Sequence, residues 1–256
     1  MADYTVKNLA DSLAVMQLFQ QKRKELSFTE IGSALKMNKT RLFRILSTLM
    51  EFNIIEQSGD NYTLGWKLFE IGQAVPLMRG FKLNTHDILR ELTDETGETA
   101  NLGILVGNEI LFIDSAEPNQ TLNASFKKGT RLPAHLTSIG KAILSGLDEV
   151  KLKQLFSHDQ FVRYTPQSVG SFGELLLQLN EVRQQGWAFD DQECYEGVRC
   201  LACPVRDHTG NITCAVSISG PATRIHKNNM EGLATRLKQV SRQFSGILGW
   251  HGSDQK

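Results

Sequence analysis

The stretch that decides the fold is NKTRLFRILSTL, residues 38–49. Successive residues of an α-helix turn by about 100°, so one face of this helix gathers the apolar side chains Leu42, Ile45, Leu46 and Leu49. The opposite face carries two hydroxyls and a guanidinium, from Thr40, Ser47 and Arg44. A solvated helix face usually mixes acids with bases. Residues 36–50 contain four bases and no acid, so this face suits a negatively charged partner.

The neighbouring segments predict two more helices and a hairpin. Ser27 and Glu30 form the capping-box pattern of a helix start, and Asn38 is suited to cap the next helix. An earlier helix is expected to bury the pair with Leu9, Leu13, Val15, Met16 and Phe19. After the central helix, residues 54–57 and 62–64 predict short strands around a Ser-Gly-Asp-Asn turn. This order is typical of a winged helix-turn-helix.

A winged helix with an acid-free central helix predicts binding to double-stranded DNA. The net charge of the chain is zero, so the contact must come from a local patch. Guanidinium groups can reach guanine edges or phosphates, and both Arg41 and Arg44 stay candidates for the base contact. The predicted DNA-contact residues are Ser27, Thr29, Lys39, Thr40, Arg41, Arg44, Ser47, Asn61 and Tyr62.

A lone amphipathic helix follows the hairpin. Its apolar residues recur at spacings of three and four, and Pro76 should kink or end it. The stripe can pack on the rest of the chain or on a second copy, and it consists of Leu68, Ile71, Val75 and Met78.

The second half of the chain alternates strands and helices in a way that predicts an α+β domain. Mostly sequential strands joined by tight turns indicate an antiparallel sheet with helices packed on it. Asp190 and Asp191 are expected in a loop. The predicted helices are 85–96, 138–146, 148–156, 171–184 and a long closing helix, and the predicted strands are 99–106, 109–116, 121–126, 197–206 and 212–219.

Cys200-x-x-Cys203 has the spacing of half a zinc site, but a strand excludes that use. Residues three apart on a strand point to opposite faces, so both thiols cannot reach one metal ion. Cys200 shares a face with Ala202, whereas Cys203 shares the other with Leu201 and Val205. No metal or other cofactor is therefore expected. Ser217 and Ser219 are two residues apart on the predicted strand 212–219, so their side chains point to the same face.

Four stretches resemble the isocitrate lyase regulator (IclR) family of bacterial transcription factors. Residues 5–72, ending in NYTLGWKLFEIG, resemble its N-terminal domain. Three stretches resemble the second domain of that family: LPAHLTSIGKAIL at 132–144, GWAFDDQECYEGVRCLACPVRD at 186–207 and ITCAVSISGPATRI at 212–225. The chain departs from the family pattern at the tip of the wing, in Gln57, Ser58 and Asp60.

The resemblance implies three parts: a winged helix-turn-helix DNA-binding domain at 1–66, a linker helix at 67–83, and a GAF-like effector-binding domain at 84–252. It implies a ligand-responsive regulator, more often a repressor, that binds a palindromic operator as a homodimer or homotetramer. The effector it implies is a small carboxylic acid, aromatic acids included. The positions that match its effector pocket are Ser138, Ile139, Asp190, Cys200, Ser217 and Ser219.

Two other classes of function stay open. An acyl-transfer or hydrolytic enzyme would use Cys200 with a base such as His135, His158 or His208, but no histidine stands in a recognisable catalytic motif. A DNA-binding protein without a ligand would leave the second domain unused. The sequence favours a regulator without enzymatic activity. No secretory signal and no run of eighteen apolar residues is visible, so the protein is expected to be soluble and cytoplasmic.

Overall fold

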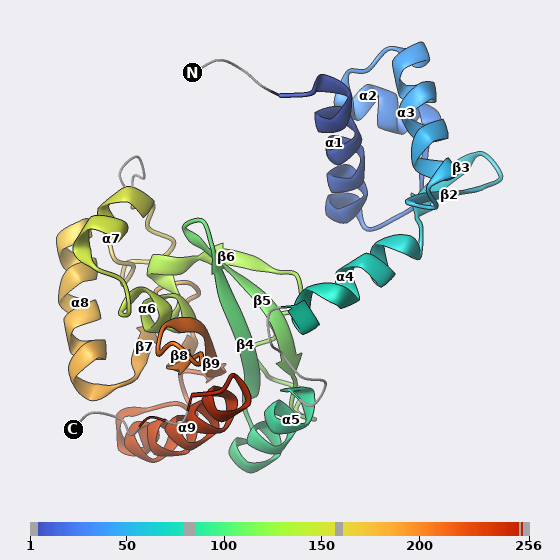
Figure 1. The fold of residues 1–256 in the computed structure, drawn as a ribbon. Helices are drawn as coiled ribbons and strands as arrows, with labels where there is room; N and C mark the ends of the chain where they lie inside the picture. Colours follow the sequence, from blue (N-terminus) through green and yellow to red (C-terminus); the bar gives the residue numbers. More distant parts are fainter. Residues whose placement is uncertain (1–4, 79–84, 157–160, 251, 253–256) are drawn as a thin grey trace. The chain divides into compact units, whose positions relative to one another are not determined.

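The computed structural model describes residues 5–78, 85–156, 161–250 and 252. The chain divides into two units, Met1–Arg79 and Gly80–Lys256 (Figure 1). The first unit is a winged helix followed by a helix, and the second is a six-stranded antiparallel sheet covered by helices. The α+β architecture that the sequence predicts is therefore confirmed.

The first unit contains, in order, α1 (Lys7–Lys22), β1 (Leu26–Ser27), α2 (Phe28–Leu35), α3 (Lys39–Glu51), β2 (Ile55–Ser58), β3 (Asn61–Leu64) and α4 (Lys67–Met78). Both expected caps are present. Ser27 and Glu30 form the capping box of α2, and the Asn38 side chain accepts the Arg41 N–H at 2.9 Å at the start of α3. The hairpin β2–β3 is the wing, and the short strand β1 extends its sheet in the order β1-β3-β2.

The core of the winged helix differs from expectation at α1. Its four expected α3 residues are buried, and α1 contributes Val15, Leu18 and Phe19. Leu9 and Leu13, which were predicted to lie in the core, are 61% and 48% exposed. That prediction is wrong, because only the C-terminal half of α1 packs its apolar side chains against the other helices. The apolar side chains of its first two turns remain exposed to solvent.

Helix α4 continues past Pro76 and ends two residues later, at Met78. The expected break at Pro76 is thus found only in the sense that the helix ends shortly after the proline. Of the apolar stripe expected here, Leu68 is half-buried and Ile71 is 52% exposed. The side chains of Val75 and Met78 lie outside the described residues.

The sheet of the second unit has the order β6-β5-β4-β9-β8-β7, with every neighbouring pair antiparallel (Figure 1). Its strands are β4 (Thr99–Val106), β5 (Glu109–Ala116), β6 (Arg131–Pro133), β7 (Ala188–Asp191), β8 (Val198–Arg206) and β9 (Ile212–Pro221). Its helices are α5 (Thr85–Thr96), the 3-10 turn η1 (Ala134–Leu136), α6 (Ser138–Leu144), α7 (Glu149–Leu155), α8 (Phe172–Gln185) and α9 (Lys227–Ile247).

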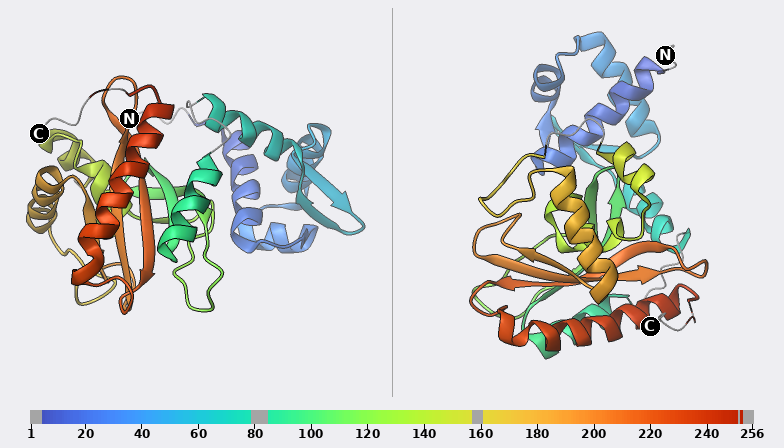
Figure 2. Two further views of the ribbon diagram at one scale, coloured as in Figure 1. Left: turned by 90° about the horizontal axis from the view of Figure 1, so that it is seen from below. Right: turned by 90° about the vertical axis from the view of Figure 1, so that its left-hand side faces the viewer.

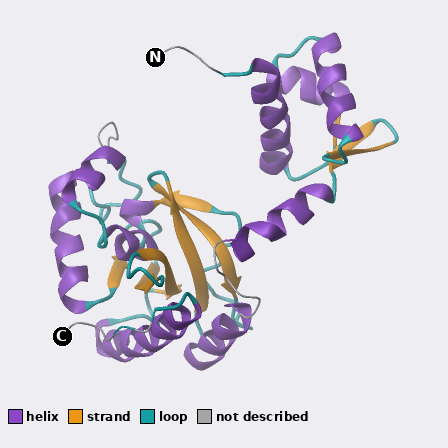
Figure 3. Ribbon diagram, viewed as in Figure 1, coloured by secondary structure: helices purple, strands orange, loops and turns teal. Residues whose placement is uncertain are grey.

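Helices cover both faces of this sheet (Figures 2 and 3). One face packs against α5 and α9, and the other packs against α6 with α8 behind it. The two thiols that the sequence placed on opposite faces are separated as expected. Cys200 and Ala202 belong to the core under α6, whereas Cys203, Leu201 and Val205 belong to the core under α9.

Two sequence predictions for this domain are wrong. Residues 121–126 form no strand; they lie in an irregular segment, and the edge strand beside β5 is β6. Ala124 and Phe126 alternate in burial because both reach into the core, which gives a strand-like pattern without strand pairing. Asp190 and Asp191 lie in β7 rather than in a loop, because residues 188–191 pair with β8. Among the described residues, no helix combines the length and apolar character needed to cross a bilayer.

Candidate functional site

The outer face of α3 presents cations and hydroxyls in the arrangement that the sequence predicts. Lys39, Thr40 and Arg44 are exposed, and Ser47 is half-buried. Arg41 differs from Arg44, because it forms an ion pair with Asp11 of α1 and is only 29% exposed. Arg44 is therefore the arginine of this face that extends into solvent, while Arg41 joins α3 to α1.

A groove of about 490 Å³ lies between α1 and α3. The α3 side of the groove is supplied by the predicted DNA-contact residues Thr40, Arg41 and Arg44. Its α1 side is polar as well, since Asn8 and Ser12 line it beside Leu9. The groove thus continues the cationic face of α3 towards the N-terminal helix.

The other predicted DNA-contact residues lie around this face. Ser27 is occupied as the cap of α2, where its hydroxyl donates to the Glu30 carboxylate at 2.9 Å, and Thr29 beside it is exposed. Asn61 is half-buried at the start of β3. Tyr62 is only 8% exposed and packs in the core with Leu26 and Ile55, so its ring is no part of the surface, contrary to the expectation. Alternation along β3 turns Tyr62 inward.

In the second unit, one small pocket brings together the six residues that were predicted to contact an effector. These are Ser138, Ile139, Asp190, Cys200, Ser217 and Ser219. Phe112, Phe126, Leu132, Thr137 and Cys194 complete the lining. The cavity measures about 10 Å³, which is room for about one water molecule. Its described lining includes hydroxyls, thiols, aromatic rings and one carboxyl group, but no lysine, arginine or histidine.

Strand register explains why these residues meet. Asp190 of β7 lies opposite Cys200 of β8, and Cys200 lies opposite Ser219 of β9. Paired residues of neighbouring strands point to the same face, so the three side chains form one row across the sheet. The parallel row contains Ser217 and its β4 partner Asn101. Both rows lie under α6, whose first residues close the pocket.

The corner between η1 and α6 depends on a glycine. A Cβ at Gly140 would lie 1.9 Å from the carbonyl oxygen of Ala134, so no other residue fits there without moving the backbone. Thr137 caps α6 and accepts the Gly140 N–H at 3.1 Å. This close approach places Ser138 and Ile139 against the sheet.

Asn101 is a central residue of the site that was not predicted from the sequence. It is fully buried, and its Nδ2 atom donates to Ser217 Oγ at 3.4 Å and to Ser219 Oγ at 3.3 Å. The Ser115 hydroxyl donates to its Oδ1 atom at 3.0 Å. Asn101 therefore orients the two serines whose hydroxyls face the pocket. The signal was available, because Thr99 and Asn101 lie two positions apart in an otherwise apolar strand and therefore share one face.

Asp190 is a buried carboxyl group with an altered proton affinity. Asp190 is only 3% exposed, and its Oδ1 atom accepts a hydrogen bond from the backbone N–H of Glu193 at 2.7 Å. Burial raises the pKa of Asp190 from 3.8 to about 7, although the nearby Lys141 ammonium and this hydrogen bond oppose the rise. Asp190 can therefore be either a neutral donor or a charged acceptor near pH 7.

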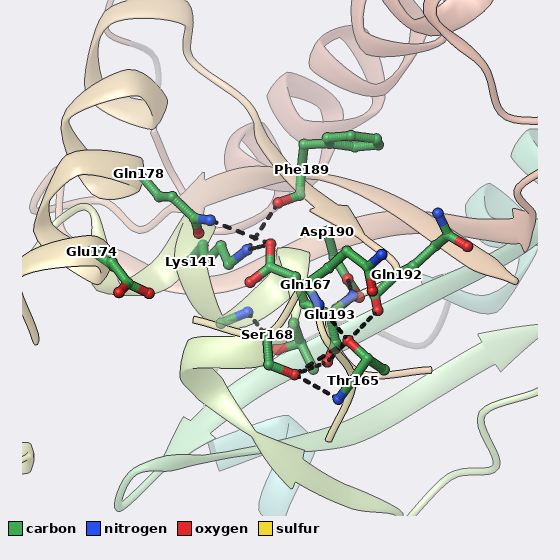
Figure 4. Close-up of polar contacts among 12 residues, drawn as sticks. Lys141, Thr165, Gln167, Ser168, Glu174, Gln178, Phe189, Asp190, Gln192 and Glu193 are labelled. Carbon is green, nitrogen blue, oxygen red and sulfur yellow. Dashed lines mark hydrogen bonds and ion pairs between the residues drawn. The ribbon is translucent and has the colours of Figure 1, made fainter. Parts of the chain in front are cut away.

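A buried ion pair lies beside Asp190 (Figure 4). Lys141 of α6 pairs with the Glu193 carboxylate, and both side chains are almost fully buried. Lys141 Nζ also donates to the Phe189 carbonyl at 3.1 Å, and Gln178 of α8 donates to Glu193 Oε1 at 3.4 Å. This cluster connects the helix that closes the pocket to the segment after β7.

The thiols of the pocket are unsuited to nucleophilic attack. Burial raises the pKa of Cys200 well above its ordinary value and that of Cys194 to about 12. Of the histidines considered as bases, His135 packs edge-on against Phe156 and Phe161, His208 is exposed, and His158 lies outside the described residues. In the described ranges, no three His, Cys, Asp or Glu side chains gather in a way that could hold a metal ion.

Comparisons with known proteins agree with this arrangement. A family model described as the IclR helix-turn-helix domain matches residues 9–59, and one described as the bacterial transcriptional regulator IclR C-terminal domain matches residues 80–246. The HTH-type transcriptional regulator XynR of Escherichia coli K12 is 32% identical over 247 residues, which cover 96% of this chain and 98% of XynR.

The HTH-type transcriptional regulator KdgR of Dickeya chrysanthemi is 34% identical over 253 residues, which cover 96% of this chain and 81% of KdgR. The crystal structure of the Thermotoga maritima IclR protein superimposes with a TM-score of 0.78 at 27% identity and covers 96% of this chain and 100% of that one. These relatives are named as transcriptional regulators, which supports the expectation of a regulator rather than an enzyme.

Proposed function

The chain belongs to the IclR family of bacterial transcriptional regulators, and we propose that α3 binds operator DNA while the pocket under α6 binds a small effector. In this proposal, residues 1–66 contact DNA, residues 67–83 link the two domains, and residues 84–252 bind the effector. Repression is the expected mode, because relatives such as AllR of Salmonella are named as repressors.

The single observation that supports DNA binding most is the exposed, acid-free face of α3. Lys39, Thr40 and Arg44 offer donors to phosphates and base edges, and no carboxylate on the helix before Glu51 repels them. The Asp11–Arg41 ion pair supports a specific role for Arg44 as the base-reading residue, because Arg41 is already bound to α1. A bidentate contact of Arg44 with guanine would discriminate against the wrong base by about 1–3 kcal/mol.

Arg44→Ala tests this assignment. We expect the variant to keep its circular dichroism spectrum, because the side chain is exposed, and to lose sequence-specific binding in a footprint. Lys153→Ala is the matched control, since it removes one exposed positive charge from α7 in the other unit. Equal specificity of the Arg44→Ala variant and the parent protein would contradict the role of α3.

The effector proposal rests on the convergence of polar groups from α6, β7 and β9 on one pocket. The hydroxyls of Ser138, Ser217 and Ser219 and the carboxyl group of Asp190 lie in a lining that also contains apolar side chains, as is typical of small-molecule sites. Without a cation in the lining, a carboxylate effector would need these donors and a protonated Asp190. Any ligand larger than water requires the pocket to open, and the irregular segment 117–130, which supplies Phe126, is the wall that we propose moves.

A thermal-shift screen of small carboxylic acids against the full-length protein tests this proposal. A ligand at 100 times its Kd stabilises the native state by about 2.7 kcal/mol. With an acid found this way, Ser219→Ala should weaken binding in calorimetry by about 1–3 kcal/mol. Thr235→Ala is the control, because it removes an exposed hydroxyl of α9 that does not line the pocket. Equal affinities of the Ser219→Ala variant and the parent protein would place the effector elsewhere.

Binding of a palindromic operator would require two copies of the chain to associate. One winged helix reads few base pairs, and two-fold dimers gain specificity by binding two half-sites of a palindrome. The exposed apolar side chains Leu9 and Leu13 on α1 and Phe69 and Ile71 on α4 supply surface for such a dimer. We propose that α1 and α4 form the dimer seam and that effector domains pair further into a tetramer.

A further inference from the structure

Phe43 is an aromatic side chain in the middle of α3 that packs against nothing in the core of its own unit. It is 63% exposed, although Leu42, Ile45 and Leu46 of the same helix are buried. By helical geometry it lies about 60° around the axis from Thr40 and about 40° from Ser47. Phe43 therefore borders the hydroxyls of the face that is proposed to enter the DNA major groove.

An exposed apolar residue alone needs no explanation. The position of Phe43 needs an explanation, because the surrounding face of α3 carries the cations and hydroxyls that are proposed to contact DNA. Within the major groove, thymine alone among the bases presents an apolar group, its C5-methyl, and phenylalanine is among the side chains that pack on it. Contact would remove both the ring and the methyl group from water.

We propose that Phe43 packs against the C5-methyl group of one thymine in each operator half-site and selects thymine at that position. The inference rests on the proposed DNA binding by α3. Charge favours DNA over an apolar protein surface as the occupant, because a protein seated on Phe43 would also cover Lys39 and the nearby Arg44, with no acid between residues 36 and 50 to balance them.

The experiment uses full-length protein and a duplex selected by it from a random-sequence pool. Each thymine of that duplex is replaced in turn by deoxyuridine, which removes only the methyl group. For the parent protein we expect one position in each half-site where the replacement weakens binding about fourfold. This factor corresponds to about 0.8 kcal/mol for one methyl-sized apolar group.

Phe43→Ala should bind the thymine duplex more weakly and lose the difference between thymine and deoxyuridine at that position. Phe52→Ala is the matched control, because Phe52 is also 63% exposed but lies at the C-terminal cap of the same helix. It should keep the fourfold difference. The Phe43 inference is overturned if deoxyuridine changes nothing at any thymine, or if the Phe43→Ala variant keeps the full difference.

Failure of the broader proposal has a separate signature. If the parent protein selects no duplex from the pool, or if Arg44→Ala binds the selected duplex with unchanged specificity, DNA binding by α3 is wrong and Phe43 has no thymine to read. If Phe43→Ala instead changes the sedimentation of the protein without changing its response to deoxyuridine, the ring contacts a second copy of the chain and the inference is also overturned.

Discussion

Replacing Asp190 by asparagine should change how the stability of the effector domain depends on pH. In the folded protein, burial holds the pKa of this carboxyl group at about 7, against 3.8 when it is free in solution. Between these values the folded state keeps a proton that the unfolded state has lost, so stability falls as the pH rises from about 4 to about 7. Below 3.8 both states are protonated, and above 7 both are ionised, so the loss is confined to that window.

The size of the effect follows from the shift. Three pKa units at about 1.4 kcal/mol each give an upper limit of about 4 kcal/mol, of which about 2 kcal/mol falls between pH 5 and pH 7. Asparagine cannot ionise, yet its side-chain oxygen can still accept the Glu193 N–H. We therefore expect the variant to gain about 2 kcal/mol of stability relative to the parent protein between pH 5 and pH 7.

Urea denaturation followed by tryptophan fluorescence measures this difference. In a Trp66→Phe background, the remaining tryptophans, at positions 187 and 250, both belong to the second unit and report on it alone. Thr165→Val is the control, because it loses the 2.8 Å hydrogen bond to the Gln192 carbonyl in the same cluster without removing a titratable group. If the stabilities of the Asp190→Asn variant and the parent protein run parallel from pH 5 to pH 7, the buried carboxyl group does not have the raised pKa that we assign to it.

Three further predictions concern the ion pair, the effector and the dimer. Lys141→Met should lower the free energy of unfolding by about 3–5 kcal/mol, because it leaves the Glu193 carboxylate buried without its cation. Adding Glu193→Gln should restore much of that loss in urea denaturation, and a double variant no more stable than the single one would contradict the account. An acidic effector should bind more tightly at pH 6 than at pH 8 in calorimetry, because protonated Asp190 can donate to its carboxylate; the opposite trend would mean that Asp190 binds as an anion. Ile71→Glu should give folded monomers that bind operator weakly, since burying a carboxylate in an apolar seam is costly. Sedimentation of an intact dimer would rule out α4 as the seam.

The sequence by itself determined the elements whose signals lie within a few residues of each other. Asn38 and the apolar spacing of Leu42, Ile45, Leu46 and Leu49 define α3, because a cap and a 3.6-residue period are local properties. The bounds of β4 and β5 follow in the same way, because Gly107 and Asn108 between the predicted strands 99–106 and 109–116 have the composition of a two-residue hairpin turn. Strand geometry also separated Cys200 from Cys203 without knowledge of the fold.

The spacing of apolar residues gave wrong predictions where the burial of a side chain does not depend on strand pairing. Ala124 and Phe126 alternate like strand residues but pair with no strand, whereas the two acids of β7 look like a loop until β8 supplies their partners. Leu9 and Leu13 continue an apolar pattern beyond the part of α1 that has a neighbour to pack on. In each case the missing information is the position of a distant element.

The pocket required the tertiary structure even though six of its residues were named from sequence. Ser217 meets Asn101 across 116 positions of chain, and Lys141 meets Glu193 across 52. No pattern in a window of residues contains such a distance, because strand register and helix packing bring these groups together only after the sheet has formed. Local patterns therefore predicted most of the helices and strands, whereas sheet pairing decided which polar groups share one enclosed site and, through burial, how tightly Asp190 holds its proton.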